Sequence, residues 1–292
     1  EIAAYEKVED AIAFSLNYIK NQVTMLSEKR GYASPLAMTL EQSHMKRETL
    51  DAMMAAIDEY LPVFRKYLRK KSGMLGHANG LPWYDLFAPL GKADKTYSIE
   101  EAKQYLIDTF TKLTPEMADL MREAFENGWI DFYPRKGKEG GAFCAGAMWL
   151  KQSRILTNYD GYFGSVDTLA HELGHAFHNR QIENHAPLNQ DYPMPVAETA
   201  STFNEVHLGK AARTEASGEE LLNLLENDIK EQTQCIVDIY SRYLFETAVF
   251  EQSQNKFLMA DDLKQIMLDA QKKTYGDGLD PECMHPYMWV CK

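Results

Sequence analysis

The segment His171–His175 places two histidines and a glutamate at a spacing that suits metal chemistry. On a helix, His171 and His175 lie one turn apart on the same face, so both imidazoles can reach one Zn²⁺ at about 2.0–2.1 Å. Glu172 points beside that face and can take a proton from a zinc-bound water without binding the metal. The pattern predicts a zinc site with two histidine ligands and Glu172 as general base.

A third ligand is expected from the next predicted helix, residues 195–205, because a catalytic zinc has three protein ligands and one open position. Glu198 is the candidate. Glu205 lies two turns later on roughly the same face and is expected to orient a ligand through a hydrogen bond, although a surface or salt-bridged carboxylate is the alternative. Asp167, one turn before His171, could also orient it, or could simply favour the start of the helix through the dipole.

The other histidines are not expected to bind this metal. His178 lies about 10 Å along the helix from His171, which suits a core or supporting role. His178 and Gln181 also stand where the metzincin pattern requires Gly and His, so that class is excluded. The alternative without a metal is a core helix with two hydrogen-bonded histidines, which would be costly to bury. Surface or core positions are expected for His44, His77, His185, His207 and His285.

Most of the chain has the periodicity of helices, and these must position the site. Ser165 is expected to cap the metal helix. Pro62 is expected to kink or break the helix that contains it. Apolar periodicity and capping residues predict further helices at about 12–26, 50–68, from 98, 115–127, 217–254 and 261–275.

The middle of the chain has a different pattern. Residues 129–133, 142–150 and 154–158 are rich in aromatic, β-branched or apolar residues, and a basic, Gly-rich loop follows the first of them. They predict a small antiparallel β-sheet beside the metal helix in a mainly α protein. No repeat or flexible linker divides the sequence, so a single domain over residues 1–292 is expected.

Composition and charge argue against some classes of partner for this protein. The net charge of −12 disfavours nucleic acid, and no apolar run is long enough for a membrane span. The four cysteines have no CxxC spacing, which favours reduced thiols in a cytoplasmic protein. The chain starts at Glu1 and stops on apolar residues, so we expect a fragment truncated at both ends, with Trp289 and Val290 exposed. The oligomeric state cannot be predicted.

Five segments together resemble the thimet oligopeptidase / oligoendopeptidase F family of zinc metallopeptidases, most closely the oligoendopeptidase F branch. The resemblance covers nearly the whole chain and includes a YDLxxP-type segment, a strand and substrate-edge region, and two metal helices. These segments are residues 83–89, 130–134, 137–144, 167–175 and 197–205.

The resemblance implies a helical gluzincin catalytic domain with one Zn²⁺ per chain, held by His171, His175 and Glu198, with Glu172 catalytic. It implies cytoplasmic cleavage of short unstructured peptides that enter a deep channel. The family's donors to the transition-state oxyanion correspond to a segment beyond Lys292, so no residue here inherits that role.

Substrate contacts are expected at Gly141, Ala142 and Phe143, because they match the family's substrate-edge region. If residues 142–147 form an edge strand, that strand could pair with the peptide backbone; an internal strand is the alternative. Two other functions stay open. One is a zinc carboxypeptidase or dipeptidyl carboxypeptidase, and the other is a catalytically incomplete fragment that only binds peptides.

Overall fold

The computed structural model describes residues 2–91 and 95–290 of the protein. Cys291, one of the four cysteines, lies outside the described residues. The chain divides into two compact units: unit 1 contains residues 1–90 and 226–292, and unit 2 contains residues 91–225. The expectation of one domain over residues 1–292 stays a prediction.

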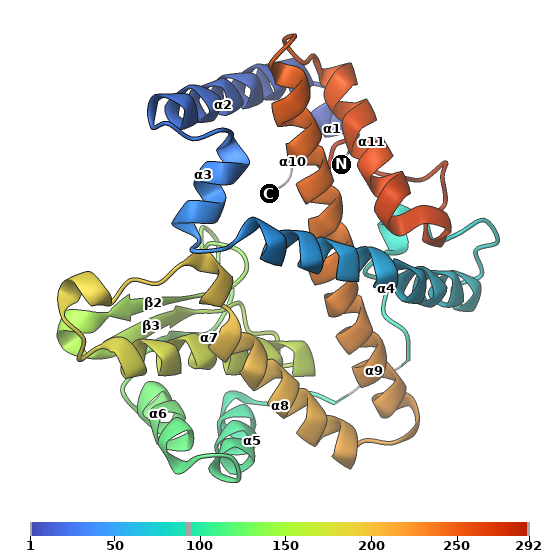
Figure 1. Ribbon diagram of the computed structural model, residues 1–292. Helices are drawn as coiled ribbons and strands as arrows, with labels where there is room; N and C mark the ends of the chain where they lie inside the picture. Colours follow the sequence, from blue (N-terminus) through green and yellow to red (C-terminus); the bar gives the residue numbers. More distant parts are fainter. Residues whose placement is uncertain (1, 92–94, 291–292) are drawn as a thin grey trace. The chain divides into compact units, whose positions relative to one another are not determined.

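Unit 1 is built from helices (Figure 1). One apolar cluster joins α2, α10 and α11, and another joins α4 to the segments around Leu81 and Tyr275. Its elements are α1 (Ile2–Tyr5), α2 (Glu9–Lys29), α3 (Pro35–Gln42), α4 (Arg47–Met74), η1 (Trp83–Asp85), η5 (Gln234–Asp238), α10 (Ile239–Ser253), α11 (Ala260–Tyr275) and η6 (Gly276–Gly278), with α9 (Gly218–Thr233) entering it from unit 2.

One expectation for unit 1 is wrong, and another is wrong in part. Pro62 does not break its helix, because α4 continues through it, and the expected kink stays a prediction. Pro62 is exposed, so water can satisfy the carbonyl that loses its helical N–H partner. Trp289 was expected to be exposed, but it packs into the cluster of α2, α10 and α11 and is only 7% exposed.

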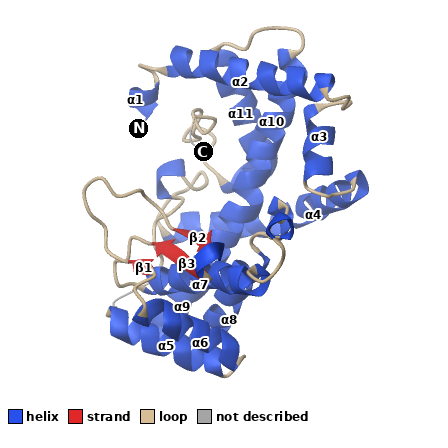
Figure 2. Cartoon of the chain, turned by 90° about the vertical axis from the view of Figure 1, so that its left-hand side faces the viewer, coloured by secondary structure: helices blue, strands red, loops and turns tan. Residues whose placement is uncertain are grey.

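Unit 2 contains the predicted metal helix and a small sheet, with further α-helices and short 3₁₀ segments (Figure 2). Ser98 and Glu101 form the predicted capping box at the start of α5. The elements are α5 (Ile99–Thr111), α6 (Pro115–Glu126), β1 (Ile130–Asp131), β2 (Phe143–Ala147), η2 (Met148–Leu150), β3 (Gln152–Leu156), α7 (Phe163–Ile182), η3 (Pro187–Asn189), η4 (Met194–Val196) and α8 (Thr199–Glu215).

The sheet has the strand order β1-β3-β2. The predicted antiparallel pairing is confirmed for β2 and β3, which form a hairpin with Gly146 opposite Ser153. In contrast, β1 runs parallel to β3, so the prediction of an antiparallel sheet is wrong for this strand. The strand order places β2 at an edge of the described sheet, so one side of its backbone has no strand partner there.

Helix α7 lies at the centre of unit 2. Leu169 and Leu173 on α7 are fully buried and pack with Leu106 and Phe110 of α5 and Met121 of α6. The sheet and α8 also lie along α7 (Figure 1). Burial of each such leucine side chain contributes about 1.5–3 kcal/mol to folding, so the metal helix is anchored in the core.

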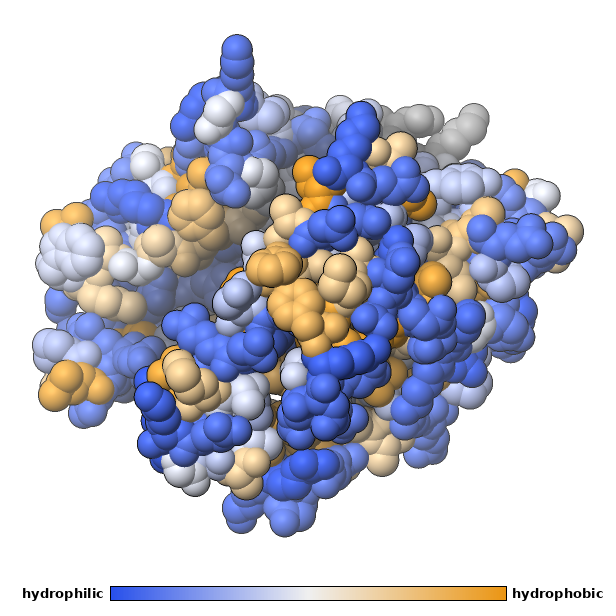
Figure 3. All heavy atoms as spheres, turned by 90° about the horizontal axis from the view of Figure 1, so that it is seen from above, coloured by the Kyte–Doolittle hydropathy of each residue, from blue (hydrophilic) through white to orange (hydrophobic). Residues whose placement is uncertain are grey.

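The mainly α fold with a small sheet is confirmed. Among the described residues, no helix combines the length and apolar character that a membrane span needs. On the face drawn in Figure 3, apolar side chains lie in small groups among hydrophilic ones. One exposed group in unit 1 is a contact of three rings, Phe14 with Tyr18 and Phe257.

Candidate metal centre

Helix α7 presents the two histidines of the predicted site. It begins at Phe163, two residues before the expected cap. Ser165 instead exchanges hydrogen bonds with Asp160: its hydroxyl donates to the carboxylate at 2.6 Å and accepts from the Asp160 N–H at 3.1 Å. The same carboxylate accepts from the N–H of Tyr162, so Asp160 fixes the start of the helix.

Glu198 comes from the segment just before α8. It is the residue preceding the first helical position, Thr199, and not a helical residue as the sequence suggested. Its carbonyl accepts from the Thr202 N–H at 3.0 Å, and its carboxylate accepts from the Ser201 hydroxyl at 2.7 Å. Ser201 is fully buried, so this contact fixes the direction of the Glu198 side chain.

Gly174 allows the two helices to approach closely. A Cβ at this position would lie 2.6 Å from the carbonyl oxygen of Ala200 and 2.7 Å from the Cα of Ser201. Those separations are too short for non-bonded atoms, so only glycine fits at position 174, next to His175 on α7. The close approach brings the start of α8 to the histidine face of α7.

Three donor atoms converge at this point. The Nε2 atoms of His171 and His175 lie 3.1 Å apart, and each is 3.2 Å from Oε2 of Glu198. Ligand atoms on one tetrahedral zinc at about 2.0–2.1 Å are separated by about 3.3 Å. The two imidazoles and one carboxylate therefore fit a single zinc ion in both chemistry and spacing.

Glu172 lies beside these donors and is buried, with 4% exposed. Its Oε2 atom has no hydrogen-bond partner among the residues that the structure describes. Burial raises the pKa of Glu172 to about 7; the charge of His171 opposes this rise, and the charges of Glu198 and Glu205 add to it. A carboxyl group with this pKa can accept and release a proton near neutral pH.

Glu205 contacts the other side of the His171 ring. Its Oε1 lies 2.5 Å from His171 Nδ1, while the ring's Nε2 faces His175 and Glu198. Burial by itself would lower the pKa of His171, but the contact with Glu205 and the neighbouring carboxylates outweigh it and raise the pKa. Asp167 lies one turn earlier on α7 and is half-buried, and its predicted orienting role stays a prediction.

Two residues beside the site were not predicted. The Tyr192 ring, from the loop between α7 and α8, stacks on His178 with centroids 4.3 Å apart. The pKa of Tyr192 is raised by burial and by the charges of Cys144 and Glu198. Burial raises the pKa of Cys144 to about 12, and the charge of Glu172 adds to this effect. No local motif marks these residues, because Tyr192 reaches the site through the path of its loop and Cys144 through the pairing of β2 with β3.

The predicted substrate-contact residues lead into the edge strand. Gly141 and Ala142 precede β2, and Phe143 is its first residue, with 47% of its surface exposed. The carbonyl of Gly141 accepts a hydrogen bond from the Asn158 amide at 2.9 Å. The structure thus places these three residues at the entry to β2, and their contact with substrate stays a prediction.

Comparisons with known proteins give one consistent result. The sequence profile of Peptidase family M3 matches residues 2–289. The chain is 28% identical over 279 residues to "Oligopeptidase PepF" of Bacillus subtilis (strain 168), a match that covers 94% of this chain and 41% of that protein.

Solved structures agree at the level of the fold. PZ peptidase A with inhibitor 2 has a TM-score of 0.75 at 18% identity and covers 95% of this chain and 50% of that one. Oligoendopeptidase-F from Enterococcus faecium has a TM-score of 0.67 at 18% identity and covers 99% of this chain and 45% of that one. The chain therefore spans half or less of the length of these relatives.

Proposed function

Because this chain belongs to peptidase family M3, we propose that it carries the metal centre of a zinc-dependent endopeptidase that cleaves short oligopeptides. The observation that supports this most strongly is the convergence of His171, His175 and Glu198 next to the buried carboxyl group of Glu172. The oligopeptide substrate is suggested by the names of the relatives and not by any contact in this chain.

The three donors would hold one Zn²⁺ and leave a fourth position open. When bound, the ion would polarise the scissile carbonyl and make a water molecule acidic enough to ionise near neutral pH. Without the ion, the buried, unpartnered Glu172 and the closely spaced donors carry an unbalanced electrostatic cost. That cost supports a resident cation at this position.

Glu172 would serve as general base in this proposal. Its Oε2 is the atom free to take a proton from the attacking water and pass it to the departing amine. In the metal-free chain the pKa of Glu172 is about 7, and the positive charge of a bound Zn²⁺ would lower it and favour the ionised form that accepts the proton. Glu205 would keep the proton of His171 on Nδ1, so that Nε2 presents its lone pair to the metal.

The edge strand β2 would hold the peptide in an extended conformation. Its outer edge offers backbone N–H and C=O groups without a strand partner in the described sheet. Pairing through the main chain would not depend on side-chain sequence, which suits an enzyme for varied peptides. The free thiols of Cys144, Cys235 and Cys283 agree with the cytoplasmic location that the proposal includes.

A second candidate is a zinc-loaded chain that binds peptides without turnover. Neither this candidate nor the carboxypeptidase alternative has an observation of its own in its favour.

The deciding experiment is a turnover assay of the zinc-loaded chain on a peptide library, read by mass spectrometry. An endopeptidase cuts internal bonds and still cuts peptides whose C-termini are amidated, whereas a carboxypeptidase loses activity on them. The matched Glu172→Gln chain should keep its zinc and lose turnover by about 10²–10⁴-fold. Peptide binding without cleavage in the unaltered chain would support the second candidate instead.

A further inference from the structure

A buried asparagine lies between the metal helix and the edge strand. Asn179 is one turn after His175 on α7 and is 8% exposed. Asparagine is unfavourable in the interior of a helix. Burying its amide costs free energy of folding unless the amide forms hydrogen bonds. The metal site described above does not use this side chain, so its position needs another explanation.

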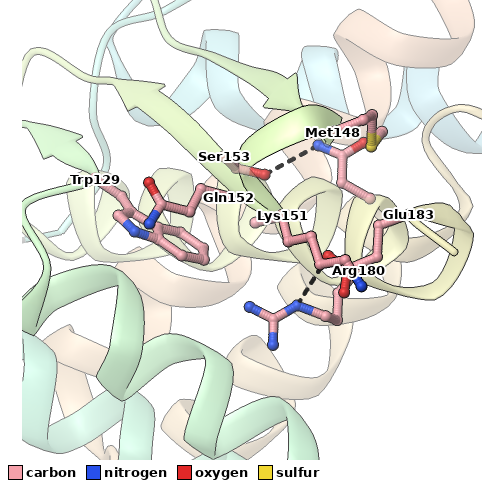
Figure 4. A pocket seen from close by; sticks show the side chains of 9 residues that line it. Trp129, Met148, Lys151, Gln152, Ser153, Arg180 and Glu183 are labelled. Atoms are coloured by element: carbon pink, nitrogen blue, oxygen red, sulfur yellow. Dashed lines mark hydrogen bonds and ion pairs between the residues drawn. The ribbon is translucent and has the colours of Figure 1, made fainter.

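The Asn179 amide contacts both strands of the β2–β3 hairpin. Its Nδ2 donates to the Ser153 hydroxyl on β3 at 3.1 Å, a contact drawn at Ser153 in Figure 4. The same nitrogen lies 3.8 Å from the Cys144 sulfur on β2. An amide NH₂ carries two hydrogens, so one side chain can serve both partners. Asn179 therefore links the metal helix directly to the edge strand.

The helix and the strand approach each other closely at this link. Gly146 on β2 pairs with Ser153. A Cβ at Gly146 would lie 3.2 Å from both Cγ and Nδ2 of Asn179, and 2.9 Å from Cε of Met148. The bare backbone of Gly146 and the amide of Asn179 thus set the separation between β2 and α7.

The loop that enters β2 is fixed independently. Asn158 donates to the carbonyls of Glu139 and Gly141, both at 2.9 Å. The Lys138 ammonium donates to the carbonyls of Asp131 and Tyr133 at 3.0 and 2.9 Å. The entry to β2 is therefore held by the sheet, which leaves Asn179 to hold the part of the strand nearest the metal helix.

A narrow opening lies beside this contact, lined by Trp129, Lys151 and Arg180 among others (Figure 4). Truncation of Asn179, which also lines this opening, would enlarge it and remove the contact to Ser153. The hairpin could then shift relative to α7.

We propose that Asn179 is a positioning residue. It fixes the distance of β2 from α7 and the position of the strand relative to His175. The inference rests on the proposed function, since it takes β2 to be the strand on which the peptide pairs. A strand held in place reduces the ordering cost of binding and keeps one peptide bond beside the metal donors. The substrate class that follows is an extended peptide recognised through its backbone.

The first test does not require activity. Backbone hydrogen exchange of residues 143–147 is compared in the unaltered chain, Asn179→Ala and Met117→Ala. Met117 is a buried residue of α6, so its truncation destabilises unit 2 by another route. We expect about tenfold faster exchange in β2 for Asn179→Ala alone, the effect of losing about one net hydrogen bond. Unchanged exchange in Asn179→Ala, or an equal rise in Met117→Ala, would overturn the proposal.

The second test measures the bound peptide in the zinc-loaded Glu172→Gln background. Methylation of the peptide nitrogen that pairs with β2 should weaken binding about tenfold, because it removes one backbone hydrogen bond. After Asn179→Ala the same methylation should matter much less, while zinc affinity stays unchanged. An equal methylation penalty in both chains would contradict the positioning role. If no peptide binds to either chain, the proposed function fails, and hydrogen exchange alone decides whether Asn179 positions β2.

Discussion

The Nδ1 atom of His171 and the Oε1 atom of Glu205 lie 2.5 Å apart, although the residues belong to different helices. The contact fixes which ring nitrogen of His171 carries the proton and turns Nε2 toward His175 and Glu198. It shows how α8 contributes to the candidate centre twice, once through Glu198 at its start and once through Glu205 two turns later.

Glu205→Ala should weaken zinc binding by about 10–100-fold, because His171 loses the partner that orients its ring. Glu205→Gln should have a smaller effect, since its amide oxygen can still accept from Nδ1. Competition with a chelator of known affinity measures both. Glu100→Ala, at an exposed glutamate of α5, is the control. Equal zinc affinity for Glu205→Ala and this control would contradict the role.

Much of this centre could be predicted from local spacing, because an i, i+4 pair on a helix has a known geometry. The contact of Glu205 could be expected for the same reason, since it lies two turns from Glu198. The stacking of Tyr192 on His178 and the contact of Asn179 with Ser153 could not, because they depend on loop paths and strand positions that leave no periodic pattern. The parallel pairing of β1 with β3 was missed for the same reason.

Gly174→Ala should destabilise unit 2 by about 1–3 kcal/mol, as expected for overpacking, because the new methyl group would meet the backbone of α8. Zinc affinity should fall with it, since Glu198 would be displaced. Gly164→Ala on the same helix is the matched control: nothing lies within 4 Å of its Cβ position. That variant should be neutral or more stable by up to about 1 kcal/mol through helix propensity. Urea unfolding measures both, and similar effects of the two variants would exclude the close-packing explanation.

The metal-free chain should lose stability as the pH rises from about 4.5 to about 7. The pKa of Glu172 is raised to about 7 in the folded chain, so the folded state binds the proton more tightly than the unfolded one. The associated stability is present below the unfolded pKa and is lost as pH rises through the folded value, by at most about 3 kcal/mol. Glu172→Gln should remove this part of the pH dependence. The check is the difference in unfolding free energy between the two metal-free chains from pH 5 to 8; a constant difference would show that Glu172 has an ordinary pKa.

Cys144 should resist alkylation at neutral pH, whereas Cys235 should react. The thiolate is the reactive form, and burial raises the pKa of Cys144 to about 12. Cys235 is an exposed free thiol. We expect at least about a hundredfold difference in rate, measured by timed iodoacetamide labelling and peptide mapping. Comparable rates would mean that β2 opens readily to solvent.

The central claim is that His171, His175 and Glu198 bind one zinc ion that Glu172 does not help to hold. It is tested most directly by zinc stoichiometry and affinity of the unaltered chain beside His175→Ala, Glu198→Ala and Glu172→Gln, each checked for native circular dichroism. We predict about one zinc per chain for the unaltered chain and Glu172→Gln, with affinity reduced at least about a hundredfold in the two ligand variants. Zinc affinity retained in both His175→Ala and Glu198→Ala would contradict the ligand assignment and the proposed function built on it.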